Sequence, residues 1–158
     1  MPGLLYRIAL GCTLGTALVA CGSQSVPSPS FDGRGAIVLV SGRDDHGLVV
    51  NHQVPLYRDP DGTEPVADIA DGQFARVLEV RGTWLQLESL DATPVRGWVD
   101  DFFLRERAVL DGRQQVRLLD ARASHGQLQI EVAPVTDPSA IPTWAPASHL
   151  TEVLAPAE

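Results

Sequence analysis

Two short acidic runs hold the side chains in this sequence that are best suited to acid–base chemistry or metal binding. In the first, Asp44, Asp45 and His46 are consecutive, and His52 follows nearby. Adjacent side chains point in different directions and rarely converge on one metal ion. Aspartate and glycine are also the residues that a tight turn needs. We therefore expect a turn at this run, and we predict no metal and no cofactor.

The second acidic run is the pair Asp100-Asp101. It lies where a one-turn helix is expected to begin, a position at which aspartate accepts from free backbone N–H groups. The sequence has no Gly-x-Ser-x-Gly elbow, no His-Glu-x-x-His pattern, no phosphate-binding glycine loop and no paired Cys-x-x-Cys motifs. His125 and His149 have no partner visible in the sequence. We predict that the protein is not an enzyme.

Cys21 has the most specific chemistry in the chain. Arg7 is the only charge before Asp32, and Ile8 to Ala20 form an apolar run too short to span a membrane as a helix. Such a segment is typical of an export signal. The sequence LVAC that ends at Cys21 resembles the bacterial lipobox. This resemblance implies a signal peptide over residues 1–20, acylation of the Cys21 thiol and cleavage just before it, whereas the alternative is a plain export signal or an uncleaved helix with a chance cysteine.

Lipidation at Cys21 has consequences for chemistry and for location. Cleavage would remove Cys12 and acylation would use the other thiol, so neither cysteine catalysis nor a disulfide is expected. Residues 21–33 form the lipidated cysteine and a flexible tether rich in serine and proline. Several acyl chains give stable anchoring. The expected location is the cell envelope after export. The resemblance to bacterial lipoproteins implies the outer membrane if the organism has one, because the residue after the cysteine is Gly22 and not an acidic residue.

Charge argues against nucleic acid as a partner. The formal net charge is −8 and the isoelectric point is about 4.8. All twelve basic residues are arginines, spaced among twenty carboxylates rather than clustered. Nucleic-acid binding needs a basic stripe or patch, so we predict no nucleic-acid partner.

The stretch from Phe74 to Leu104 has the pattern of one antiparallel β unit. Apolar residues recur along 74–81 and 84–88, on either side of a turn at Gly82-Thr83, which predicts a hairpin with Phe74, Leu78 and Val80 on one buried face. Residues 97–99, Gly-Trp-Val, are predicted as a third strand, and residues 100–104 as a tight 3₁₀ turn. This order of elements is that of a small barrel.

The same elements resemble the bacterial SH3-like domain. The resemblance rests on Asp71-Gly72, then VLEV, then Gly82-Thr83-Trp84, then Arg96-Gly97-Trp98-Val99, and finally Leu104. It covers residues 54–106, with residues 54–71 as the first strand and its long loop. It implies a small barrel that presents aromatic residues in a groove. The candidate ligand-binding residues are Tyr57, Trp84, Trp98 and Phe103.

Residues 107–154 repeat the central unit in a divergent form. Residues 118–122, LLDAR, parallel residues 77–81, VLEVR; residues 128–131 parallel 85–88; and residues 143–152 parallel 97–106. Gln127 stands in place of Trp84, and His149 in place of Phe103. Only residues 105–110 separate Leu104 from Asp111, so we expect the second repeat to lack a first strand like that in 54–71, which would expose a sheet edge. We expect a β-hairpin at 36–50, within an N-terminal region of 34–53, to fill this gap.

The sequence thus predicts an all-β protein with tandem small SH3-like barrels, the second divergent or incomplete. Aromatic faces recognise extended peptides or sugars by flat contact. The expected function is a lipid-anchored envelope binding module that recognises peptidoglycan or a wall peptide. The alternative is an accessory lipoprotein that docks on an envelope protein complex.

Overall fold

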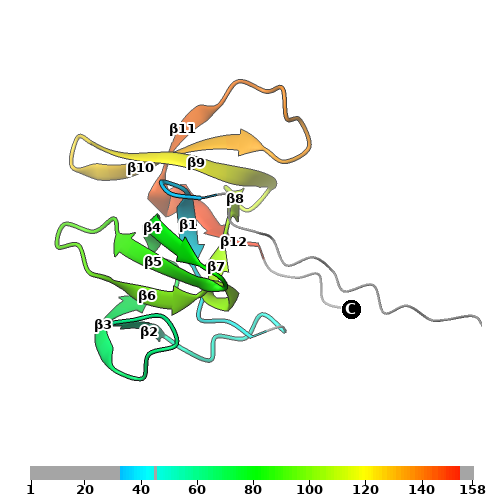
Figure 1. Ribbon diagram of the computed structural model, residues 1–158. Helices are drawn as coiled ribbons and strands as arrows, with labels where there is room; N and C mark the ends of the chain where they lie inside the picture. The colour runs from blue at the N-terminus through cyan, green and yellow to red at the C-terminus, as the bar shows by residue number, and fades with distance from the viewer. Residues whose placement is uncertain (1–32, 45, 154–158) are drawn as a thin grey trace, which may run out of the picture. The chain divides into compact units, whose positions relative to one another are not determined.

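The computed structural model describes residues 33–44 and 46–153, and the fold of these residues is all-β (Figure 1). They form a curled seven-stranded half-barrel sheet, a five-stranded sheet and two one-turn 3₁₀ helices, with no α-helix within these ranges. No helix of the described residues is long and apolar enough to cross a membrane. The predicted signal peptide 1–20, Cys21 and the tether up to residue 32 lie outside the described residues.

The seven-stranded sheet is antiparallel and has the strand order β3-β2-β6-β5-β4-β1-β7. Its strands are β1 (Ile37–Val40), β2 (Gln53–Tyr57), β3 (Pro65–Ala70), β4 (Phe74–Arg81), β5 (Trp84–Ser89), β6 (Arg96–Asp100) and β7 (Leu104–Arg105). The 3₁₀ helix η1 (Asp101–Phe103) joins β6 to β7, as the sequence predicted. Residues 54–71, predicted as one strand with a long loop, contain most of the hairpin β2–β3.

The five-stranded sheet is also antiparallel, with the order β11-β10-β9-β8-β12. Its elements are β8 (Arg107–Leu110), β9 (Gln114–Ser124), β10 (Gln127–Pro134), β11 (Thr143–Pro146), the 3₁₀ helix η2 (Ala147–His149) and β12 (Leu150–Glu152). The series β9, β10, β11, η2, β12 therefore has the same order of element types as β4, β5, β6, η1, β7. We call the seven-stranded sheet with η1 the first repeat and the five-stranded sheet with η2 the second repeat.

Both long hairpins contain a bulge at the same place in the repeat. In the β4–β5 ladder the register shifts at Leu78, and in the β9–β10 ladder it shifts at Leu119, the residue matched to Leu78 in sequence. A bulge turns the residues beyond it relative to the alternation of the strand. The predicted buried face of β4 is wrong: Ala75 and Val77 face the core of the first repeat, whereas Phe74 is buried in the other core. The bulge brings Val80 opposite Leu85, but Val80 lies near the end of the hairpin and is 37% exposed.

The strand β1 does not fill a gap in the second repeat. It pairs with β4 on one side and with β7 on the other, so it belongs to the seven-stranded sheet. The expected partner at 48–50 forms no regular strand, and only an isolated bridge between Arg43 and Val49 closes that loop. The hairpin predicted at 36–50 is therefore wrong, because β4 and β7 occupy both edges of β1 and leave none for residues 48–50.

The second repeat has its own strand at the place that β1 occupies in the first. Strand β8 lies between β9 and β12, just as β1 lies between β4 and β7. The sequence predicted that the second repeat lacks a counterpart of residues 54–71, and no strand lies between β8 and β9. The prediction missed β8 itself, which takes the place expected for the N-terminal hairpin. A tight turn at Asp111-Gly112, with φ values of 51° and 67°, lets β8 pair with β9 immediately.

Two hydrophobic cores meet at β1. Val38 and Val40 belong to the core of the first repeat, whereas Ile37 and Leu39 belong to the core of the second. All four residues are almost fully buried. Because successive side chains of a strand point to opposite faces, one apolar strand serves both cores. This accounts for a run in the sequence with no polar alternation.

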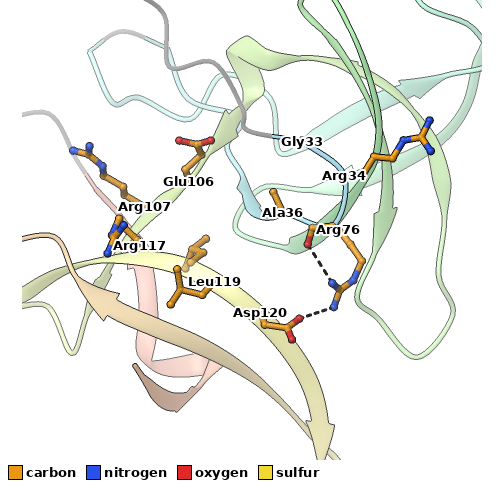
Figure 2. A pocket seen from close by; sticks show the side chains of 11 residues that line it. Gly33, Arg34, Ala36, Arg76, Glu106, Arg107, Arg117, Leu119 and Asp120 are labelled. Atoms are coloured by element: carbon orange, nitrogen blue, oxygen red, sulfur yellow. Dashed lines mark hydrogen bonds and ion pairs between the residues drawn. The ribbon is translucent and has the colours of Figure 1, made fainter. Parts of the chain in front are cut away.

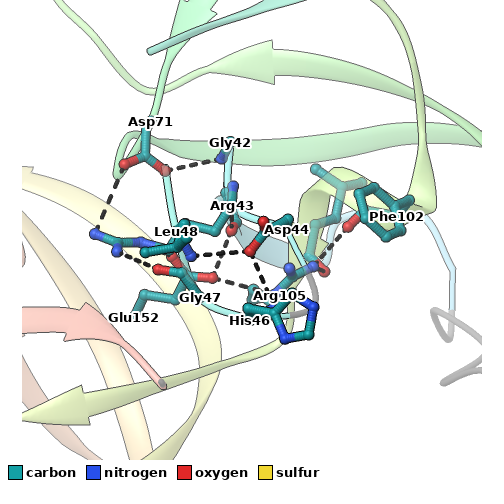
Figure 3. A network of polar contacts seen from close by, with 12 residues as sticks. Gly42, Arg43, Asp44, His46, Gly47, Leu48, Asp71, Phe102, Arg105 and Glu152 are labelled. Atoms are coloured by element: carbon teal, nitrogen blue, oxygen red, sulfur yellow. Dashed lines mark hydrogen bonds and ion pairs between the residues drawn. The ribbon is translucent and has the colours of Figure 1, made fainter. Parts of the chain in front are cut away.

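A polar network ties the end of β12 to the loop after β1 and to β7 (Figure 3). The Glu152 carboxylate accepts from the Ser41 hydroxyl and lies 3.3 Å from Arg105 Nε. Glu152 Oε2 lies 2.8 Å from Arg43 Nε and forms an ion pair with it. The contact lacks hydrogen-bond geometry, so the Arg43 Nε–H group has no acceptor among the described residues. The Glu152 side chain is only 10% exposed, so this carboxylate is a partly buried link between the two repeats.

Candidate functional site

The predicted aromatic residues gather on the face of the first sheet that points away from its core. Leu85 and Leu87 in β5 are buried in the core. Trp84 and Gln86 alternate with them along the strand and therefore lie on the opposite face. In the ladders, Trp98 lies opposite Gln86 and also opposite Tyr57. Directly opposite residues share one face of a sheet. Tyr57, Trp84 and Trp98 therefore lie on the same outer face, which we call the aromatic face.

Tyr57 and Trp84 form an edge-to-face pair at the end of β2 and the start of β5. Their ring centroids are 5.9 Å apart and their planes make an angle of 79°. Both side chains are only partly buried. Edge-to-face pairs hold aromatic rings in a defined orientation, so these two residues present fixed apolar surface to solvent.

Trp98 lies directly opposite Tyr57 in the ladder and is a packing residue. It is only 4% exposed, yet it belongs to neither hydrophobic core. The guanidinium carbon of Arg81 lies 4.9 Å from its ring centroid, and Arg81 Nε is held 2.8 Å from Glu79 Oε1. An arginine over an indole face makes a favourable cation–π contact. Trp98 thus has little surface left for a ligand.

Phe103 lies apart from the other three candidates. Its side chain packs against the core of the first repeat, and its ring contacts Phe102 edge to face at 5.3 Å. No ring contact joins it to Tyr57, Trp84 or Trp98 in the described part of the chain. The structure brings three of the four candidates together and places Phe103 in a packing position.

The acidic pairs have structural partners. Asp100 caps η1 by accepting from the Phe102 N–H at 3.0 Å, as expected from the sequence. Burial raises the pKa of Asp101 above its ordinary value, and the neighbouring Asp100 carboxylate adds to the shift. Asp44 accepts from the N–H groups of His46 and Leu48, which closes the predicted turn, whereas Asp45 lies outside the described residues. The described residues contain no group of three or more potential metal ligands.

The second repeat has an arginine stacked on a tryptophan but lacks a counterpart of the Tyr57–Trp84 pair. Arg122 lies over the Trp144 ring at 4.0 Å from its centroid, as Arg81 lies over Trp98. Gln127, exposed to solvent, takes the place of Trp84 at the start of the hairpin strand. The sequence match between VLEVR and LLDAR contained the signal for this stacking, since both segments end in arginine and both repeats contain a matched tryptophan.

Comparisons of this chain with models of protein families, with curated proteins and with solved structures find no significant match.

Proposed function

We propose that the protein is a lipid-anchored, non-catalytic binding module of the cell envelope, whose SH3-like first repeat recognises peptidoglycan or a wall peptide through the aromatic face. The observation that carries the proposal is the Tyr57–Trp84 pair, fixed edge to face at 5.9 Å and partly open to solvent. Rigid aromatic surfaces of this kind bind sugar rings and extended peptides at little cost in conformational entropy. Trp98 and Arg81 are the ladder neighbours of Tyr57 and Trp84, respectively, and flank the pair.

The binding test uses the fragment that begins at Phe31, which corresponds to the compact unit Phe31–Glu158. Purified, insoluble peptidoglycan is mixed with the fragment and sedimented, and the bound fraction gives Kd. We expect Tyr57→Ala and Trp84→Ala each to weaken binding at least about tenfold, as loss of an aromatic hot spot does. Melting temperatures of the same variants separate lost binding from lost folding.

The matched control is Phe102→Ala, which removes an aromatic ring that is 46% exposed but lies outside the aromatic face. This variant should bind peptidoglycan as tightly as the parent fragment. If Tyr57→Ala and Trp84→Ala lower the melting temperature but leave the affinity per folded molecule unchanged, the proposal fails.

The location is tested by the acylation of Cys21. Palmitate labelling of cells that express the full chain should mark the parent protein, and Cys21→Ser should remain unlabelled and uncleaved, because the lipobox offers a single thiol for acylation. Labelling that survives this substitution would contradict the proposed anchor.

A second candidate function is docking on an envelope protein as an accessory lipoprotein. It is favoured by exposed apolar side chains near the first repeat: Leu48 is 65%, Val50 is 57% and Phe102 is 46% exposed. Crosslinking in membranes followed by a pulldown tests this function. Loss of the crosslinked partner in Leu48→Ser or Phe102→Ser, with peptidoglycan binding absent from the parent, would favour docking over wall recognition.

A further inference from the structure

An open cavity of about 610 Å³ lies between the two repeats, away from the residues that define the aromatic face (Figure 2). It is lined by the segment before β1 and by residues of β4, β8 and β9. Its charged lining residues are four arginines and two carboxylates, namely Arg34, Arg76, Arg107, Arg117, Glu106 and Asp120. This excess of positive charge occurs in a chain whose net charge is −8.

One wall of the cavity is already neutralised. Arg76 Nη2 lies 3.0 Å from Asp120 Oδ1, and Arg76 Nη1 donates to the Gly35 carbonyl at 3.2 Å. These bonds fix the Arg76 guanidinium between the first repeat, the second repeat and the segment before β1. Arg76 and Asp120 therefore shape the cavity but leave no net charge there for a ligand.

Arg107 and Arg117 form the other wall together with Glu106, and the four arginines of the whole lining exceed its two carboxylates by two positive charges. Arg107 and Arg117 are direct partners in the β8–β9 ladder, and Figure 2 shows their side chains next to each other. Both are exposed, and neither makes an ion pair or a side-chain hydrogen bond with any residue that the structure describes. Like charges directly opposite each other destabilise an antiparallel pair. A bound anion would remove this repulsion.

We propose that Arg107 and Arg117 bind a phosphate group at the mouth of this cavity. The planar guanidinium fork matches phosphate oxygens in bidentate geometry. A phosphate monoester carries close to two negative charges at neutral pH, which balances the excess of two positive charges in the lining, whereas one carboxylate balances only one. The group belongs either to a small phosphorylated solute or to a lipid headgroup. This inference does not depend on wall recognition by the aromatic face.

The test measures thermal unfolding of the full chain in an uncharged maltoside detergent, with inorganic phosphate and with chloride at equal ionic strength. At a concentration a hundredfold above its Kd, phosphate is expected to raise Tm by about 5–10 °C. Arg107→Gln and Arg117→Gln should each raise the Kd for phosphate at least about tenfold. The matched control is Arg113→Gln, which removes the same charge from the β8–β9 turn but does not line the cavity.

Further arms of the test identify the source of the phosphate. Dihexanoyl phosphatidic acid carries a phosphate monoester on a lipid, and dihexanoyl phosphatidylcholine is its neutral control. Stabilisation by inorganic phosphate alone supports a small solute, and stabilisation by phosphatidic acid as well supports a headgroup. The proposal is overturned if neither probe stabilises the parent chain or if Arg113→Gln weakens phosphate binding as much as Arg107→Gln. Triglutamate tests whether carboxylates bind instead, and the proposal is also overturned if triglutamate stabilises the chain and phosphate does not.

Discussion

The first repeat and the second repeat have the same order of strands and the same bulge, but their outer faces differ. In the first, Arg81 covers Trp98, and the exposed pair Tyr57–Trp84 lies beside them. In the second, Arg122 covers Trp144, and Gln127 stands where Trp84 would be. The hairpin β2–β3, which carries Tyr57, has no counterpart between β8 and β9.

This difference separates residues that stabilise the fold of a repeat from residues that are proposed to bind a ligand. A feature present in both repeats, such as an arginine stacked on a tryptophan, is explained by the stability of the repeat itself. A feature present in one repeat only, such as the Tyr57–Trp84 pair, adds nothing that the other repeat needs for folding. The comparison of the two repeats therefore supports the proposal that Tyr57 and Trp84 contact a ligand, whereas the buried Trp98 serves packing.

The largest expected effect tests the two stacked tryptophans against each other. Trp98 is 4% exposed, whereas Trp144 is only partly buried at the matched position. We expect Trp98→Ala to lower the free energy of unfolding by about 3–5 kcal/mol, as loss of a buried aromatic ring does. Trp144→Ala should cost less than about 2 kcal/mol because less surface returns to water. Urea unfolding of both variants measures the difference, and equal losses would contradict the distinction between the two faces.

An intermediate effect is expected at Gly97, where the presence of β2 matters. A Cβ atom at Gly97 would lie 2.6 Å from Leu56 Cβ and 3.1 Å from the Tyr57 carbonyl oxygen. Strand β2 packs this closely because it pairs with β6, whereas β11 is at the edge of its sheet. We therefore expect Gly97→Ala to cost on the order of 1–3 kcal/mol through overpacking.

The matched control for Gly97→Ala is Thr143→Ala. Thr143 occupies the corresponding position in the second repeat and is exposed. Its substitution should change the free energy of unfolding by no more than about 0.5 kcal/mol. A Gly97→Ala variant as stable as the parent protein would show that β2 can move away from β6, and the position of Tyr57 on the aromatic face would then be doubtful.

Local signals in the sequence were sufficient to predict the central elements. Alternating apolar residues and the turn at Gly82 predicted β4 and β5, and the acidic pair Asp100-Asp101 agreed with a one-turn helix at η1. The match between VLEVR and LLDAR predicted a second unit with the same order of elements. These signals are local because each element is specified by residues close to one another in the chain.

Strand pairing and the arginine cavity were not predictable in the same way. Strand β1 is apolar on both faces, so its sequence does not distinguish which of two sheets it joins. Residues 97–99 are all buried, and their pattern does not show that Trp98 faces away from the core. Arg107 and Arg117 belong to one hairpin, but Arg34 and Arg76 come from segments distant from it in sequence. Only the fold brings them to one place, which is why the charge distribution along the chain gave no sign of a basic site.

The smallest expected effect concerns Asp120, where the two repeats differ in the partner of one acidic residue. In the first repeat Glu79 pairs with Arg81 of its own strand, whereas the matched Asp120 pairs with Arg76 across the repeats. The N–H of Ala121 and then the Arg76 guanidinium hold the pKa of Asp120 below its ordinary value of 3.8. A carboxyl whose pKa is lower in the folded protein stabilises the fold above the unfolded pKa and loses this contribution as the pH falls through the folded value.

Asp120→Asn should therefore cost up to about 1 kcal/mol at neutral pH, since the Asp120 side chain is 53% exposed and its ion pair is screened by solvent. The difference from the parent protein should shrink as the pH falls below about 4. Urea unfolding at several pH values measures it, with Glu79→Gln as the control for a pair within one repeat. If the Asp120→Asn difference is the same at pH 7 and at pH 2.5, the Asp120–Arg76 ion pair makes no contribution, and the apolar packing around β1 and the Glu152 network hold the two repeats together.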